Sequence, residues 1–157
     1  MKELIALPLL LLTLVFQMAI ASRVPILGGY ADLMLVALAA WSLQKRVETA
    51  WHWAIFGGLL VGWTSALPWV VPLSGYLLTV AFARLLVRSI WQAPLLGIFA
   101  VVFAGTLGGH IIAILTLRLF GSPLVISDAL STVTLPSLFL NLLLALPAYP
   151  IFRDLAV

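Results

Sequence analysis

The stretch that decides the fold runs from Ala93 to Leu119, APLLGIFAVVFAGTLGGHIIAILTLRL, and its only Asp, Glu, Lys or Arg side chain is that of Arg118. A helix of roughly 20 apolar residues crosses the hydrocarbon layer of a bilayer, which is about 30 Å thick. Because no water reaches the backbone there, a spanning segment must satisfy its N–H and C=O groups internally. We therefore predict that this stretch is a membrane-spanning helix.

The rest of the chain has the same character. Apolar residues make up 64% of the 157 residues, charged residues 8%, and the mean hydropathy is +1.25. A soluble domain carries about 25% charged residues, so this chain could not hide its apolar surface from water. The composition predicts an all-α integral membrane protein in which residues 1–157 form a single membrane domain.

The few charged residues divide the chain into segments of membrane length. Six spans are predicted, at about 4–21, 30–44, 51–68, 73–88, 93–119 and 129–151. The second and fourth are short, and we expect tilt or local thinning of the bilayer to accommodate them. The predicted fold is a bundle of six transmembrane helices.

The amino terminus is open to two interpretations. Lys2, the apolar run Leu4–Phe16 and the small residues Ala19–Ala21 resemble a cleavable signal peptide. The same residues also fit an uncleaved first span. We favour the span, because Glu3 cancels the charge of Lys2 and the remaining chain itself consists of spans.

The basic residues predict the orientation in the membrane. Short cytoplasmic loops are enriched in Lys and Arg. A cytoplasmic amino terminus places six basic residues inside and leaves only Arg23 and Arg118 outside; the six are Lys2, Lys45, Arg46, Arg84, Arg88 and Arg153. We therefore expect a multi-pass membrane protein with both termini in the cytoplasm. The net charge of +3 marks membrane edges, and no nucleic-acid partner is expected.

Small residues at a spacing of four predict the faces on which helices pack, because association in lipid depends on close approach of backbones. The third span carries the stripe Ala54, Gly58, Gly62 and Ala66, which includes a G-x-x-x-G pair. The fifth span carries two stripes, one with Ala100 and Ala104 and the other with Gly105 and Gly109. These faces either pack within the bundle or bind another membrane protein, and both interpretations stay open.

Three polar residues inside the spans are candidate site residues, because polar and ionisable groups in a membrane are costly. Asp32 opens the second span and either caps its helix or contacts a partner or ligand. His110 is interpreted as a hydrogen-bonded structural residue, with a proton relay or metal ligand as the alternative. Asn141 is expected to form a hydrogen bond between helices.

Catalytic patterns are absent from the sequence. It has no G-x-S-x-G, H-E-x-x-H or phosphate-loop motif, no cysteine and only five acidic residues, mostly at span edges. We expect no enzyme activity, no cofactor and no metal site. A carrier of an uncharged or weakly polar solute remains compatible with the composition.

Three stretches together resemble the bacterial rod-shape-determining protein family MreD. They are a proline-containing loop and Asp-Leu opening the second span (Pro25–Leu33), the glycines of the third span (Gly57–Gly62), and the closing span from Leu135-Pro136-Ser137 through Asn141 to Leu146–Pro150. The resemblance covers nearly the whole chain. Two family features are missing: Ala31 stands where the family often has proline, and the third span has no acidic residue.

The resemblance implies a protein of the bacterial inner membrane that serves as a non-catalytic scaffold or regulatory subunit of the cell-elongation machinery and maintains rod shape. Proteins like MreD associate with MreC and, through it, with MreB filaments, RodA and a class B penicillin-binding transpeptidase that builds peptidoglycan.

Two alternatives remain. One is the substrate-binding S-component of an energy-coupling-factor vitamin transporter, a six-span protein of similar length whose fold MreD-like chains are thought to share. The predicted outer connections, at about 23–29, 68–72 and 120–127, are short and mostly apolar, which disfavours vitamin capture. The other is a small membrane protein of lipid metabolism, for which no catalytic residue can be named.

Overall fold

The computed structural model describes residues 5–21, 23–87 and 93–155, and within them the regular structure is helical. This confirms the all-helical part of the predicted fold. In chain order the elements are α1 (Ala6–Phe16), a π-helical turn (Gln17–Ala21), α2 (Leu33–Ser42), α3 (Ala50–Thr64), α4 (Val70–Leu86), α5 (Pro94–Leu119), α6 (Ile126–Asp128), a second π-helical turn (Ala129–Thr134) and α7 (Leu135–Leu155).

Two helices of the described chain are long and apolar enough to cross a membrane. They are α5, with 26 residues, and the continuous helix Ile126–Leu155, with 30 residues, which joins α6, the second π-helical turn and α7. The apolar helices Leu7–Ala21, Leu33–Ser42 and Val70–Leu86 are shorter. The arrangement as six membrane spans therefore stays a prediction.

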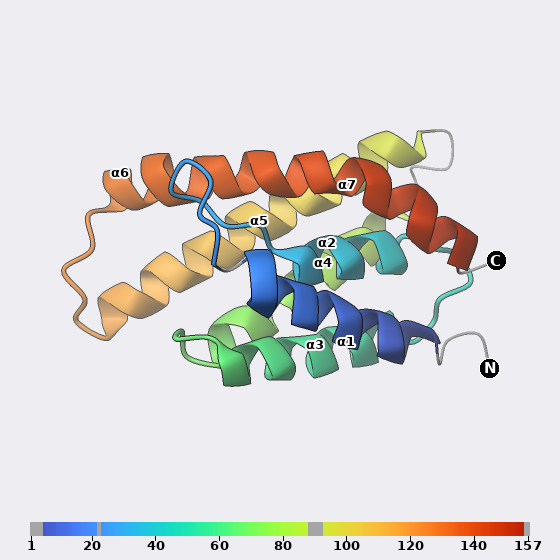
Figure 1. Cartoon of the computed structure of the whole chain (residues 1–157), viewed down its shortest axis with the longest axis horizontal. Helices are drawn as coiled ribbons and strands as arrows, with labels where there is room; N and C mark the ends of the chain where they lie inside the picture. The colour runs from blue at the N-terminus through green and yellow to red at the C-terminus, as the bar shows by residue number, and fades with distance from the viewer. Residues whose placement is uncertain (1–4, 22, 88–92, 156–157) are drawn as a thin grey trace.

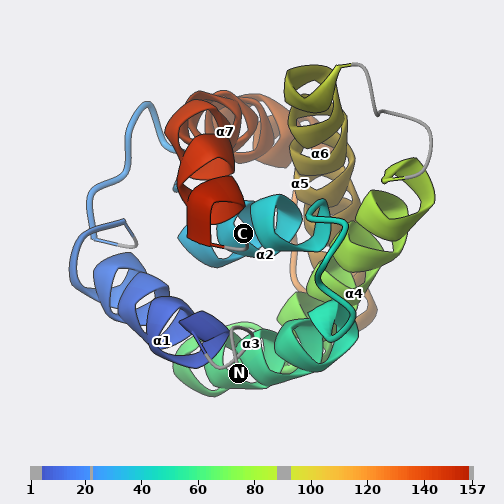
Figure 2. The ribbon, with the colours of Figure 1, turned by 90° about the vertical axis from the view of Figure 1, so that its right-hand side faces the viewer.

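The second predicted span contains a much shorter helix than expected. We predicted about 30–44, whereas α2 has 10 residues, which corresponds to a length of about 15 Å. α2 lies at the centre of the bundle, with the longer helices around it (Figure 2), and every residue from Met34 to Ser42 is buried. The segment before it, residues 23–32, enters the bundle as irregular chain. Such backbone is tolerated at membrane depth only inside protein or beside a cavity.

The third predicted span ends earlier than expected, and the prediction that Ala66 belongs to its helix is wrong. α3 ends at Thr64, and Ser65 is extended, so Ala66 lies in a bend beyond the helix and does not continue the stripe. The cause is local: Pro68 disfavours helical geometry at the residue before it, and the Ser65 hydroxyl accepts a hydrogen bond of 3.1 Å from the backbone N–H of Leu67.

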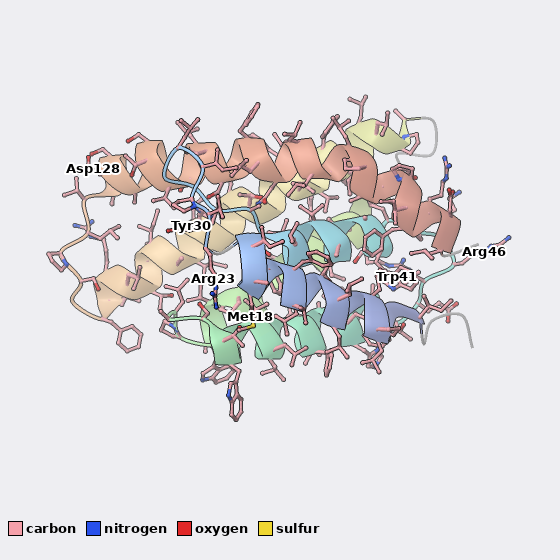
Figure 3. All side chains as sticks on the ribbon, viewed as in Figure 1. Met18, Arg23, Tyr30, Trp41, Arg46 and Asp128 are labelled. Atoms are coloured by element: carbon pink, nitrogen blue, oxygen red, sulfur yellow. The ribbon has the colours of Figure 1, made fainter. Side chains whose placement is uncertain are left out.

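The bundle has two distinct ends. The first turn of α1 and the last turn of α7 lie at the same end (Figure 1). Arg46 also lies there, and Asp128 lies at the opposite end (Figure 3). We call these the Arg46 end and the Asp128 end.

The Arg46 end gathers basic residues from separate elements. Arg84, near the end of α4, donates a hydrogen bond of 2.9 Å to the carbonyl of Val47 in the loop that carries Arg46. Lys2 and Arg88, which were predicted to lie on the same side, fall outside the described residues. Arg46 and Arg84, two of the six residues predicted to be cytoplasmic, thus lie at one end of the bundle, and the orientation in the membrane stays a prediction.

Candidate functional site

The amino-terminal end of α2 is the centre of the candidate site. Asp32 is the N-cap residue, and its Oδ1 accepts a hydrogen bond of 2.9 Å from the backbone N–H of Leu35. The side-chain Oε1 of Gln17, from the turn after α1, accepts one of 2.9 Å from the N–H of Met34. Two orphan N–H groups at the start of this buried helix are therefore satisfied by side chains.

Hydrogen bonds hold the chain before α2 against α7. The backbone N–H of Tyr30 donates to Ser137 Oγ at 2.9 Å, and that of Asp32 donates to Asn141 Oδ1 at 2.7 Å. The Nδ2 of Asn141 also donates to Thr106 Oγ1 on α5 at 3.0 Å. Asn141 is fully buried and joins three segments, which is the interhelical role expected of it.

Tyr76 connects α4 to the same centre. Its hydroxyl lies 2.9 Å from Oδ1 and 3.1 Å from Oδ2 of Asp32, so it donates to the carboxylate. Tyr76 is not among the candidate site residues that the sequence indicates. A tyrosine at a span edge gives no sequence signal that distinguishes an internal hydrogen bond from an interfacial position.

A cavity of about 480 Å³ lies beside these groups. It is lined where α3 ends, where α4 begins and along the second half of α5, and therefore faces the Asp128 end. Most of its wall is apolar, and its polar lining includes Gln17, Asp32, Tyr76, Thr106, His110 and Asn141. The three polar residues singled out from the sequence, Asp32, His110 and Asn141, thus line one cavity.

His110 has one partner in the described chain, Thr134 of the second π-helical turn. The distance from His110 Nδ1 to Thr134 Oγ1 is 3.0 Å, and the same hydroxyl lies 3.2 Å from the carbonyl of Ala129. Because the hydroxyl donates its hydrogen to that carbonyl, Nδ1 is the donor to Thr134, which leaves Nε2 as an acceptor. No group of three possible metal ligands occurs among the described residues.

The glycines of α3 pack inside the chain. A Cβ atom built on Gly58 would lie 2.7 Å from the Cα of Leu73, and one on Gly62 would lie 2.9 Å from the Cα of Trp69. Ala54 on the same stripe is fully buried. This face of α3 is therefore used within the bundle, against the segment that begins α4.

Gly105 and Gly109, which share one stripe of α5, differ from each other in their surroundings. Gly105 lies against the Thr79 side chain of α4, and a Cβ there would overlap the hydroxyl oxygen. A Cβ on Gly109 would meet nothing within 4 Å, because Gly109 lines the cavity. The stripe predicted from the sequence therefore packs on α4 at one position and borders empty space at the other.

An apolar groove runs over the other stripe of α5. Ala100 and Ala104 lie between larger side chains, which come from α5 itself (Phe99 and Phe103), from α4 (Phe82) and from α7 (Phe139, Leu142 and Leu146). All of its lining residues are apolar, and its volume is about 770 Å³. We call this the α5 groove.

Comparisons with known proteins leave the family open, since no family model, no curated protein and no solved structure matches the chain.

Proposed function

We propose that this chain is a non-catalytic scaffold subunit of the bacterial cell-elongation machinery, with a role like that of MreD. It lies in the cytoplasmic membrane as six spans with both termini in the cytoplasm. It binds MreC, and through MreC it supports peptidoglycan synthesis by RodA and a class B transpeptidase along MreB filaments.

The observation that carries the proposal is the contact between the two most distinctive stretches of the MreD resemblance. The segment before α2 and the start of α7 are more than 100 residues apart in sequence, yet Tyr30 bonds to Ser137 and Asp32 to Asn141. The resemblance therefore falls on residues that form one structural unit. A fold built around such a buried polar connection suits a rigid subunit that positions other membrane proteins.

The α5 groove provides a face for the partner that the proposal requires. Ala100 and Ala104 allow a second helix backbone to approach closely. The groove lies along one of the two helices long enough to cross a membrane, so its occupant lies within the hydrocarbon layer. We assign it to the transmembrane helix of MreC.

The first test is recovery of partners with the tagged full chain after gentle detergent extraction from its own host. We expect mass spectrometry to find MreC together with RodA or the transpeptidase. Ala104→Phe fills the floor of the α5 groove and should reduce the recovery of MreC about tenfold, equivalent to about 1.4 kcal/mol, because the added ring prevents the close approach on which helix association in lipid depends. Absence of MreC, RodA and the transpeptidase from the wild-type preparation would contradict the scaffold proposal.

The matched control is Leu115→Phe on the same helix. Leu115 is exposed and lies outside the groove, so the added ring meets lipid. This variant should recover MreC like the wild type. An equal loss in both variants would mean that bulk anywhere on α5 disturbs the chain, and the assignment of the groove would be lost.

The proposed orientation predicts which residues can be reached from each side. The chain has no cysteine, so a single introduced cysteine is the only thiol in the protein that a maleimide can label. Ser127→Cys, next to Asp128, should react with a membrane-impermeant maleimide on intact spheroplasts. Asp154→Cys, at the exposed end of α7, should react only after the membrane is opened. The reverse pattern would invert the proposed topology.

A second candidate function, the S-component of a vitamin transporter, is favoured by one observation. The cavity of about 480 Å³ has polar groups at its base and faces the Asp128 end, which is the outer side in the proposed orientation. The same partner-recovery experiment separates the two functions. Recovery of a transporter's membrane subunit with its ATPases would support this candidate in place of the scaffold.

A further inference from the structure

The cavity beside α2 presents a carboxylate whose neighbours are all neutral. The hydrogen-bond donors to Asp32 are all neutral: the backbone N–H groups of Leu35 and Met34, the hydroxyl of Tyr76 and the side chain of Gln17. No Lys or Arg belongs to the described lining of the cavity. A carboxylate in such surroundings is stabilised most by a cation, because a charge removed from water is costly unless it is paired.

The hydrogen-bond donors leave the charge of the carboxylate unpaired. They already supply about as many hydrogens as the four or so lone-pair sites of an ionised carboxylate accept. None of them carries a positive charge, so what Asp32 lacks is a cation and not a further neutral donor.

His110 adds a second acceptor to the cavity. With Nδ1 donating to Thr134, its Nε2 carries a free lone pair. The remaining wall is mostly apolar, contributed by residues such as Leu35, Val71 and Ile114. The cavity thus offers acceptors to a head group and hydrocarbon surface to a body, within the usual range of roughly 300–1,000 Å³ for small-molecule sites.

We propose that this cavity binds a small cationic amphiphile, an amine with an apolar or aromatic body, whose ammonium group is bound by Asp32. The ammonium supplies the positive charge that the neighbours of the carboxylate lack, and the body fills the apolar part between α4 and α5. This ligand site is independent of the scaffold proposal, since neither the partner recovery nor the α5 groove depends on it.

Paired probes of equal shape test the charge requirement. Tryptamine and tryptophol share an indole-ethyl body and end in an ammonium or a hydroxyl. We expect calorimetric titration of the full chain in detergent and phosphate buffer to show tryptamine binding about tenfold or more tightly, because a charge-assisted hydrogen bond is roughly twice as strong as a neutral one. Equal affinities, or no binding of either probe, would overturn the proposal.

Asp32→Asn removes the charge and keeps an oxygen that can cap α2. In this variant the two affinities should converge. Asp128→Asn, which removes a carboxylate from an exposed position at the same end of the bundle, should keep the preference of the wild type. A preference for the amine that persists in Asp32→Asn would show that another group binds the ammonium.

Gly109→Leu provides a test that leaves Asp32 unchanged. A Cβ at Gly109 has open space around it, so the leucine enters the cavity without meeting the backbone. This variant should fold and lose measurable affinity for both probes. Undiminished binding of tryptamine to a folded Gly109→Leu protein would place the amine outside the cavity and would refute the assignment.

Discussion

Gly58→Leu should leave almost no folded protein after detergent extraction. A Cβ at this position would lie 2.7 Å from the Cα of Leu73, which is backbone and cannot rotate away. α3 and α4 would have to separate to admit the side chain. Overpacking by a few methylene groups costs about 1–3 kcal/mol, and a leucine against a helix backbone exceeds that range. Gly62→Leu should behave alike, because its Cβ would lie 2.9 Å from the Cα of Trp69.

Gly109→Ala is the matched control for these glycine substitutions. Its Cβ would meet nothing within 4 Å, and alanine favours helix over glycine by about 0.5–1 kcal/mol. This variant should elute as a single species in size-exclusion chromatography and melt at or above the wild-type temperature. A folded Gly58→Leu protein with wild-type melting would show that α3 and α4 do not pack as described.

The same geometry determines what the α3 glycines can reveal about function. Their face is occupied by α4, so a loss of partner binding after Gly58→Leu would follow from the unfolded bundle. Variants in the α5 groove are therefore the informative test of partner binding, because Ala100 and Ala104 are not covered by another segment of the described chain.

The helical character of the chain and several packing faces could be predicted from the sequence. Helices follow from the apolar composition. A spacing of four places Gly58 and Gly62 on one side of their helix, whichever helix packs against that side. The spacing does not show which helix packs against the glycines. Ala66 shows the limit of periodicity, because Ser65 and Pro68 end the helix before the stripe is complete.

The cavity could not be predicted in the same way. Asp32, His110 and Asn141 were recognised one by one as polar residues in apolar spans, but their convergence depends on where α2 begins. That start is set by contacts over long sequence separations, Asp32 to Asn141 and Tyr76 to Asp32. Gln17 carries a sequence signal of the same kind as these three residues, because it is the one amide side chain in the predicted first span, whose other polar residue is Thr13.

Asn141→Leu should produce the largest loss of stability among the polar substitutions. Asn141 is fully buried and accepts from the Asp32 N–H at 2.7 Å while it donates to Thr106 at 3.0 Å. Leucine fills similar space but leaves a backbone donor without a partner, at a cost of about 1–3 kcal/mol. Thermal unfolding of the detergent-purified chain should show the loss. Ser137→Ala removes only the bond to Tyr30 and should cost less.

Hydrogen exchange distinguishes this specific role from a general loss of packing. If Asn141 holds the segment before α2 in place, the amides of residues 23–32 should exchange faster in Asn141→Leu, while those of α3 keep their protection. Ser131→Ala, which changes an exposed hydroxyl bonded to its own helix, should alter neither region. Uniformly faster exchange in Asn141→Leu would instead make Asn141 an ordinary core residue. The connection between the two MreD-like stretches would then no longer support the scaffold proposal.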